Sequence, residues 1–139
     1  MKNRELIGLL NQAIELEYQA FIQYYYQSLE LRGLENAALK AMLAEEADAE
    51  LGHAKALAER VVALGGAPAM KIAPVKLGKT AKEMIRHNLD REAKAIALYR
   101  KIVKATRQVE GCELVYLLAL KILGDELKDL EEFEAFLEK

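Results

Sequence analysis

The 139-residue chain has few of the residues that form disulfides, and it has no long apolar run. Cys112 is the one cysteine, so no disulfide can form within the chain, which fits a reducing compartment. The longest apolar run, residues 114–120, is far too short to span a membrane. The first residues, MKNRELIGLLNQAIELEYQ, are interrupted by polar side chains before a signal-peptide core could form. These absences predict a cytoplasmic protein with no membrane partner.

Excess positive charge and nucleotide-binding motifs are absent as well. The formal net charge is -2 and no strongly basic run occurs, which argues against a nucleic-acid partner. There is no phosphate-binding loop of the GxGxxG or GxxxxGK(S/T) type. There is also no cluster of cysteines that could hold zinc or an iron–sulfur centre.

The sequence has long stretches rich in Ala, Leu, Glu and Lys, separated by a few positions with Gly or Pro. Such stretches favour helices, and they predict four of them, over residues 4–32, 36–64, 81–108 and 112–137. Thr80 and Glu83 form a capping-box pattern at the start of the third helix. The first and last connections are short, which predicts two antiparallel hairpins.

The middle connection is longer and contains both prolines, Pro68 and Pro74. Fully extended, residues 65–79 could reach about 45 Å, enough to return along the whole bundle. The sequence therefore predicts one all-α domain over residues 1–139, a four-helix bundle of two hairpins joined by a long crossover.

Each predicted helix carries an apolar stripe that is interrupted by acidic residues near its middle and then resumes. One acid of this kind on its own is more often a partly exposed residue, and one histidine is more often a hydrogen-bonded core residue. The coincidence on all four helices instead predicts a buried polar layer at mid-bundle. Its members, in chain order, are Glu17, Glu50, His53, Glu92, Glu126 and Asp129.

A buried layer of acids needs positive charge, because an ionised carboxylate in an apolar interior is very costly. The stripes offer no Lys or Arg at the same level. Divalent cations would supply the charge and bind carboxylate oxygen and imidazole nitrogen. A shell with many carboxylates and one histidine favours iron or manganese over zinc or copper. Glu46, one turn before Glu50, either lines an ion path or lies at the bundle edge.

Four motifs resemble those of the bacterioferritin family of ferritin-like di-iron carboxylate proteins. They are ELEYQAFIQYY (15–25), EADAELGHA (46–54), MIRHNLDREAKAI (84–96) and LALKILGDELKDLEEFE (118–134). The family pattern has one Glu from each of two helices and Glu-x-x-His from each of the other two. The resemblance implies that Glu17 and Glu92 are terminal ligands, that Glu50 and Glu126 bridge two iron ions, and that His53 is a ligand. It also implies that Tyr24 is the tyrosine near the metals.

Three departures from the family pattern stand out. Asp129 replaces the expected second histidine; it still faces the site but reaches less far and adds negative charge. Leu51 stands where haem-binding members have methionine, so no haem is expected. The chain ends soon after the fourth helix without the short fifth helix of ferritin cages, which leaves the assembly open between a dimer and a cage.

The resemblance implies a ferroxidase that oxidises Fe2+ with O2 or H2O2 for iron storage or detoxification, working as a homo-oligomer. Glu17, Glu50, His53, Glu92, Glu126 and Tyr24 would form its catalytic site. Two alternatives remain open: a rubrerythrin-like di-metal peroxidase or oxidase acting as a dimer, and an iron-binding bundle without turnover.

Overall fold

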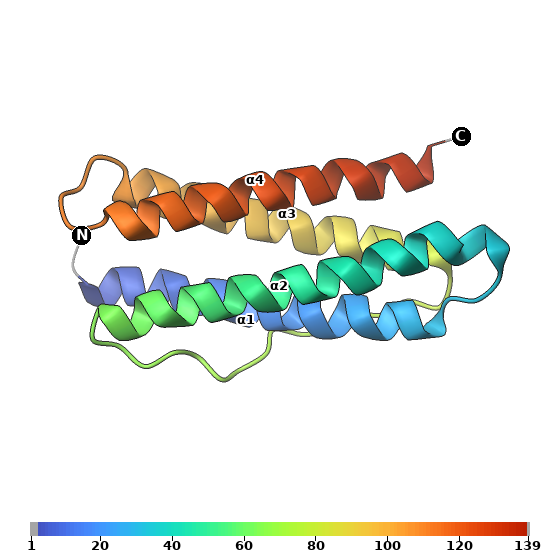
Figure 1. The fold of residues 1–139 in the computed structure, drawn as a ribbon, viewed down its shortest axis with the longest axis horizontal. Helices are drawn as coiled ribbons and strands as arrows, with labels where there is room; N and C mark the ends of the chain where they lie inside the picture. Colours follow the sequence, from blue (N-terminus) through green and yellow to red (C-terminus); the bar gives the residue numbers. More distant parts are fainter. Residues whose placement is uncertain (1–2, 139) are drawn as a thin grey trace.

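The computed structural model describes residues 3–138, and four long helices account for most of them. Helix α1 spans Asn3–Glu30, α2 Ala37–Ala63, α3 Ala81–Thr106 and α4 Glu113–Leu137. A short 3-10 turn, η1, covers Leu34–Asn36 before α2. The predicted four-helix bundle is confirmed, and the described residues contain no strand (Figure 1). The first and third helices end two residues earlier than predicted.

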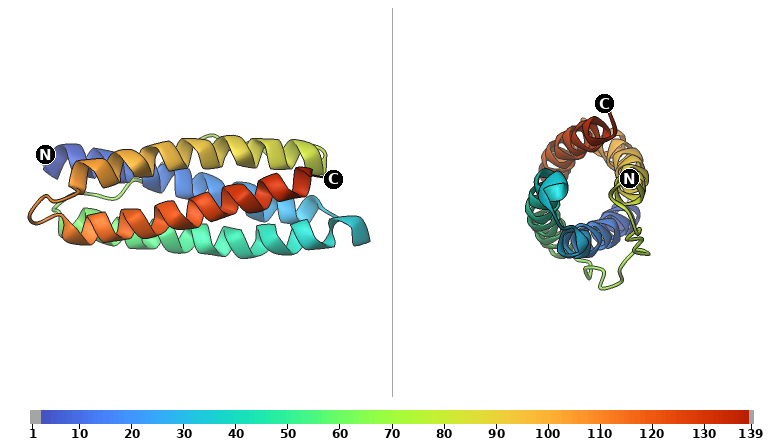
Figure 2. Two further views of the ribbon diagram at one scale, coloured as in Figure 1. Left: turned by 90° about the horizontal axis from the view of Figure 1, so that it is seen from above. Right: turned by 90° about the vertical axis from the view of Figure 1, so that its right-hand side faces the viewer.

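The helices form two hairpins that pack side by side. Helix α1 packs mainly on α2, and α3 packs mainly on α4. The connection between the hairpins runs along the outside of α1 from one end of the bundle to the other (Figure 1). As a result α2 and α3 point the same way, while α1 and α4 point the opposite way. The end-on view shows the four helices around a common axis (Figure 2). The predicted crossover topology is therefore correct.

Local chemistry explains where the helices begin and end. Gly33 follows α1 with a φ of 87°, a backbone conformation that is open to glycine and strained for most other residues. Thr80 caps α3, because its hydroxyl accepts a hydrogen bond from the Glu83 amide at 3.1 Å. The Glu83 carboxylate in turn accepts from the Lys79 amide at 2.7 Å. The capping role predicted for Thr80 and Glu83 is confirmed.

The crossover is attached to α1 by polar side chains spaced four or eight residues apart, so they lie in a row along one side of the helix. Asn11 donates to the Ala67 carbonyl at 3.1 Å and accepts from the Ala69 amide at 2.8 Å. Further along the row, Gln19 and Gln27 donate to crossover carbonyls, those of Pro74 and Leu77. This row holds a long irregular segment against the bundle and satisfies its backbone groups.

The apolar core is divided into two clusters, one towards each end of the bundle. The first is built around Leu10, Ile14, Leu57 and Ile122, and the second around Tyr24, Leu43 and Phe133. Burying one Leu or Ile stabilises the fold by about 1.5–3 kcal/mol. Because an apolar cluster stabilises each end of the bundle, polar side chains can occupy its middle. Within residues 3–138, no helix has the length and apolarity needed to cross a membrane.

Candidate metal centre

All six residues of the predicted polar layer lie inside the bundle. The carboxylates of Glu17, Glu50, Glu92 and Glu126 have no solvent exposure, and His53 and Asp129 are 7% and 4% exposed. The stripe analysis therefore assigned their faces correctly. Each residue lies within its helix and has one or more turns of apolar residues on either side.

These side chains form two groups whose ligand atoms are close enough to share a metal ion. In each group the atoms lie within 4.8 Å of one another. The first group consists of Glu17, Glu50, His53 and Glu126, and the second of Glu50, Glu92, Glu126 and Asp129. Glu50 and Glu126 belong to both groups. This arrangement can hold two adjacent cations with two carboxylates between them.

His53 is oriented by an acidic partner that the sequence analysis did not identify. Its Nε2 lies 2.9 Å from Asp125 Oδ2, so this nitrogen donates to the carboxylate. The other ring nitrogen, Nδ1, faces the buried acids, at 3.1 Å from Glu50 Oε1 and 3.2 Å from Glu17 Oε2. A carboxylate behind a histidine is the usual arrangement for directing its second nitrogen towards a metal.

Two buried tyrosines hold the outer glutamates in place. The Tyr24 hydroxyl donates to Glu92 Oε2 at 2.5 Å, and the Tyr99 hydroxyl donates to Glu17 Oε2 at 2.6 Å. Both rings are fully buried. Burial, together with the neighbouring carboxylates, raises the pKa of both tyrosines. Both phenols therefore stay protonated at neutral pH and act as donors. The placement predicted for Tyr24 near the site is confirmed.

The expectation that no Lys or Arg lies at the level of the acids is wrong, because Arg91 extends into the layer. Arg91 is 2% exposed, and its guanidinium lies within 3.2 Å of carboxylate oxygens of four residues. Those residues are Glu17, Glu50, Glu92 and Glu126. The apolar stripe predicted for this helix runs through Leu89 and Glu92. The buried face is in fact centred slightly differently, on Asn88, Arg91 and Ala95.

Burial and mutual repulsion shift the pKa values of the acids in different directions. Burial raises the pKa of Glu50 and of Glu92 well above the ordinary value, and the charge of Glu126 adds to both shifts. Burial also acts to raise the pKa of Glu126, but the charge of Arg91 and the hydrogen bonds to Glu92 and His53 together outweigh burial and hold that pKa well below its usual range. The acids of one layer therefore differ in how readily they give up a proton.

The pKa values of His53 and Asp129 are both raised. Burial alone would lower the pKa of His53, but the surrounding carboxylates, Glu126 first, raise it. Burial and the adjacent Glu46 carboxyl raise the pKa of Asp129 to about 9. Metal binding to these groups would therefore release protons, because a metal takes the deprotonated form of each.

The donor set fits a pair of metal ions, because several buried donor atoms have no hydrogen-bond partner. Four buried atoms of the predicted ligands lack a hydrogen-bond partner: Glu50 Oε1, His53 Nδ1, Glu126 Oε1 and Asp129 Oδ2. In an ordinary core such groups are almost always paired, and an unpaired one costs about 1–3 kcal/mol. Oxygen and imidazole nitrogen atoms in this arrangement are the ligands that iron and manganese accept. Their role as ligands stays a prediction.

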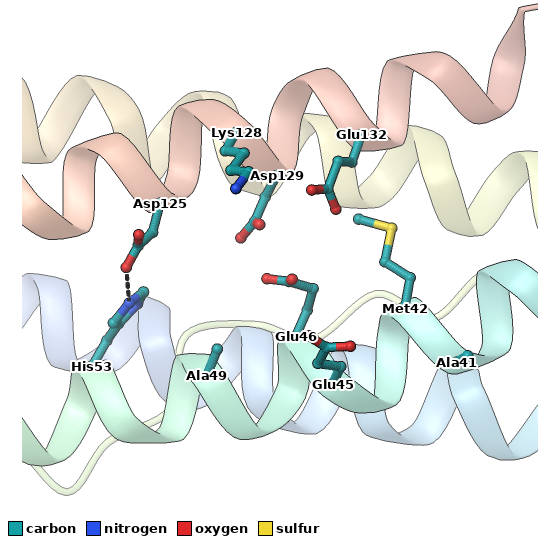
Figure 3. Close-up of a pocket in the computed structure, with 10 residues that line it drawn as sticks. All are labelled: Ala41, Met42, Glu45, Glu46, Ala49, His53, Asp125, Lys128, Asp129 and Glu132. Atoms are coloured by element: carbon teal, nitrogen blue, oxygen red, sulfur yellow. Dashed lines mark hydrogen bonds and ion pairs between the residues drawn. The ribbon is translucent and has the colours of Figure 1, made fainter.

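A pocket of about 560 Å³ between α2 and α4 leads from the surface to the layer. His53 and Asp129 lie at its inner wall (Figure 3). Glu46 on α2 faces Asp129 on α4 across it, Glu132 lies three residues further along α4, and ligand atoms of these three lie within 4.8 Å of one another. The sequence left two interpretations of Glu46 open, lining an ion path or lying at the bundle edge. Glu46 is half-buried and lines this pocket. The pocket is predominantly acidic and so favours the approach of cations.

Three functional candidates were missed by the sequence analysis, and each had a weak signal. Asp125 directly precedes Glu126 on the fourth helix, and a predicted histidine ligand calls for an acidic partner. Tyr99 was counted as an apolar stripe residue although its hydroxyl needs a partner when buried. Arg91 directly precedes Glu92, but a long charged side chain can lie along either face of a helix, so its sequence position did not show that its charged end is buried.

Comparisons with known proteins agree with the geometry. A family described as the ferritin-like domain matches residues 7–139. Bacterial ferritin from Synechocystis sp. is 31% identical over 127 residues, which cover 89% of this chain and 80% of that protein. Bacterioferritin from Brucella melitensis is 32% identical over 131 residues, covering 92% of this chain and 76% of that protein.

Solved structures show the same arrangement of helices. A structure of ferritin-like, diiron-carboxylate proteins from Bacillus anthracis superposes with a TM-score of 0.92 and 29% identity over 99% of both chains. The buried layer, the crossover topology and these sequence matches agree along the whole bundle, and this chain belongs to the ferritin-like family.

Proposed function

We propose that the protein binds two Fe2+ ions in the buried acidic layer and oxidises them to Fe3+. The observation that carries the proposal is the pair of overlapping four-residue groups that share Glu50 and Glu126. Glu17 and His53 complete one metal position, and Glu92 and Asp129 complete the other. Relatives named for ferritin and for diiron carboxylates support iron as the metal. Manganese fits the same oxygen-rich donor set.

The chain's own residues would prepare this reaction before any substrate arrives. Asp125 orients His53, while Tyr24 and Tyr99 orient the terminal carboxylates. Fixed ligands lower the cost of organising the site when the metals bind. The surplus of carboxylates over cations favours the more highly charged Fe3+ product.

Iron is the substrate, and the electron balance is simple. Two Fe2+ ions each lose one electron, and one O2 with two protons becomes H2O2, or one H2O2 with two protons becomes two waters. The carboxyl groups whose pKa values burial raises would hold protons that metal binding releases into the site. The acidic pocket lined by Glu46, Asp129 and Glu132 is the route by which Fe2+ would approach.

The test is an anaerobic Fe2+ titration followed by O2 or H2O2. We expect two Fe2+ bound per chain, and then rapid appearance of the ultraviolet absorbance of Fe3+. One Fe2+ per chain with oxidation no faster than in buffer would favour the iron-binding alternative without turnover. Much faster reaction with H2O2 than with O2 would favour the peroxidase alternative.

We also propose that the protein works as a homo-oligomer of two or more copies. Apolar side chains that include Phe21, Leu51 and the largely exposed Met70 line a pocket of about 380 Å³ on the outside of the bundle. A structural neighbour at 23% identity, with a TM-score of 0.90 over 99% of this chain and 86% of its own, is a dodecameric thioferritin from Bacteroides fragilis. Leu51 offers no ligand atom, so haem is not part of this proposal. Light scattering on the purified protein would measure the assembly, and a monomer at micromolar concentration would contradict it.

A further inference from the structure

Arg91 lies in the middle of the second group of acids. Its Nη1 donates to Glu50 Oε2 at 2.6 Å, to Glu126 Oε2 at 2.9 Å and to Glu92 Oε1 at 3.2 Å. These are three of the four residues that make up this group; the fourth is Asp129. The positively charged nitrogen therefore lies where the carboxylates of the second metal position converge.

The other atoms of the guanidinium are engaged differently. Nη2 donates to Glu17 Oε1 at 2.7 Å and to the Leu16 carbonyl at 3.0 Å, while the buried Nε has no partner. Both terminal nitrogens of Arg91 are thus hydrogen-bonded, and only Nε is left without a partner. A guanidinium that was purely structural would be expected to have all of its buried donors paired.

The first metal position remains complete beside Arg91. The guanidinium uses the Oε2 atoms of Glu50 and Glu126, whereas their Oε1 atoms are unpaired. These two Oε1 atoms lie 3.1 Å and 3.5 Å from His53 Nδ1. A cation could bind among these atoms while Arg91 stays in place.

We propose that Arg91 is an internal counter-ion that competes with the second metal ion for its position, so that the two metals bind in a fixed order. This inference rests on the proposed pair of metal sites. A carboxylate oxygen that contacts Nη1 cannot also bind a metal ion on that side, because two cations would then repel each other at close range. The first metal binds with Arg91 inside the layer, and the second binds as the guanidinium leaves the carboxylates.

The structure offers Arg91 a place outside the layer. A pocket of about 200 Å³ between α1, α3 and the crossover is bordered by Arg91 itself. Asp90 and Gln19 line this pocket, and Gln19 Oε1 is a buried acceptor without a partner. Lys76 and Lys94 line it too, and their charge opposes the outward position. Arg91 should therefore stay inside the layer until a second metal ion displaces the guanidinium from the carboxylates.

The test is a calorimetric titration of Mn2+ into the full-length protein after chelator treatment, comparing wild type with Arg91→Leu. We expect two binding steps in the wild type, with the second weaker. In Arg91→Leu the second step should tighten at least tenfold more than the first. Arg86→Leu is the matched control, since Arg86 is an exposed arginine on the same helix, and both of its steps should match the wild type.

Removing Arg91 could unfold the chelator-treated bundle, so Arg91→Gln is titrated in parallel, and circular dichroism checks folding. An equal change in both steps, in either folded variant, would overturn the competition. So would a crystal structure with two Mn2+ in which Arg91 still contacts Glu50 and Glu126. One Mn2+ bound by wild type but two by the variants would support it, as the extreme case of competition.

Failure of the proposed oxidation is separate from failure of this inference. Mn2+ binding that follows the expected pattern, with no oxidation of Fe2+, would contradict the ferroxidase proposal and still support the competition by Arg91. If wild type and both variants, all folded, bind no Mn2+, the metal sites and the competition fall together.

Discussion

The bundle buries an amide network between α1 and α3 and an acidic layer to which all four helices contribute, and the two regions differ in how completely their atoms are paired. In the first, Asn88 accepts from Gln23 Nε2 and donates to Gln27 Oε1, each at 2.8 Å. Gln23 Oε1 and Gln27 Nε2 are paired in turn with backbone groups of Lys76 and Leu77 on the crossover. Every side-chain amide group of this network has a partner.

The second region is the acidic layer, one turn further along α3. Here five atoms remain unpaired: Glu50 Oε1, His53 Nδ1, Arg91 Nε, Glu126 Oε1 and Asp129 Oδ2. Burial also raises the pKa values of Glu50 and Glu92 well above the ordinary value and, with the adjacent Glu46, raises that of Asp129 to about 9. Both regions are equally buried, so burial does not separate them.

The comparison separates a structural polar region from a functional one. Matched amides attach the crossover to the bundle and need nothing further. The carboxylates of the layer outnumber the charge that Arg91 supplies, so a bound metal cation would lower the cost of burying them further. Buried groups that lack partners, and whose pKa values are shifted, thus point to a site more reliably than buried polar residues alone.

Replacing a shared ligand should separate the two regions most sharply. Mn2+ or Fe2+ at a hundredfold excess over Kd should stabilise the wild type by about 2.7 kcal/mol per site, a rise in Tm of roughly 10 °C for one site. Glu50→Ala should weaken metal binding by more than about 100-fold, because even residues that only support ligands contribute about 10–100-fold. Scanning calorimetry with and without metal measures both. An unchanged shift in Glu50→Ala would refute the shared-ligand assignment.

Breaking the amide network should have the opposite signature. Asn88→Leu leaves Gln23 Nε2 and Gln27 Oε1 buried without partners, so the free energy of unfolding should fall by about 2–4 kcal/mol. Metal stoichiometry should stay at two per chain. Urea unfolding measures the first quantity and calorimetric titration the second. Normal stability with lost metal binding would mean that the network serves the site and not the fold.

Removing the partner of His53 tests how far the site extends. Asp125→Ala should weaken metal binding by about 10–100-fold, because His53 Nε2 loses the acceptor that orients its ring. Lys121→Ala is the matched control, since Lys121 contacts the same carboxylate at 3.0 Å from the solvent side. Its metal affinity should be unchanged. Equal losses in both variants would indicate a general effect of surface charge.

Restoring histidine at the fourth-helix position should have the smallest effect. Asp129→His replaces a shorter, negatively charged side chain by a neutral ligand, and we expect the second metal to bind about tenfold more tightly, or ~1.4 kcal/mol. Anaerobic Fe2+ titration measures this second step. Weaker binding would place Asp129 in the pocket with Glu46 and Glu132 and not on the metal.

Much of the fold and most of the site could be predicted from periodicity. The four helices, the crossover and the six inward-facing residues follow from a repeat of 3.6 residues that any helix imposes. The acids stood out because they interrupt otherwise apolar stripes. Helix ends shifted by up to two residues, since local capping and not the stripe sets where each helix stops.

Arg91 shows where periodicity stops being informative. Adjacent residues on a helix point about 100° apart, so the predicted stripe through Glu92 did not include Arg91. Its stem is long enough to bend back into the layer, and no sequence pattern records that choice. The partners of His53 and Glu17 were missed for a similar reason, because Asp125 and Tyr99 act across helices.

The order of residues along this chain thus dictates four amphipathic helices, their connection by a long crossover, and a level at which each helix presents acid to the interior. That information is local, because spacing along one helix sets the direction of each side chain. How the charges of that layer are balanced is a property of the packed bundle. Arg91, His53 and the carboxylate oxygens without hydrogen-bond partners come together only when atoms from four helices meet in the buried interior, where charges are weakly screened.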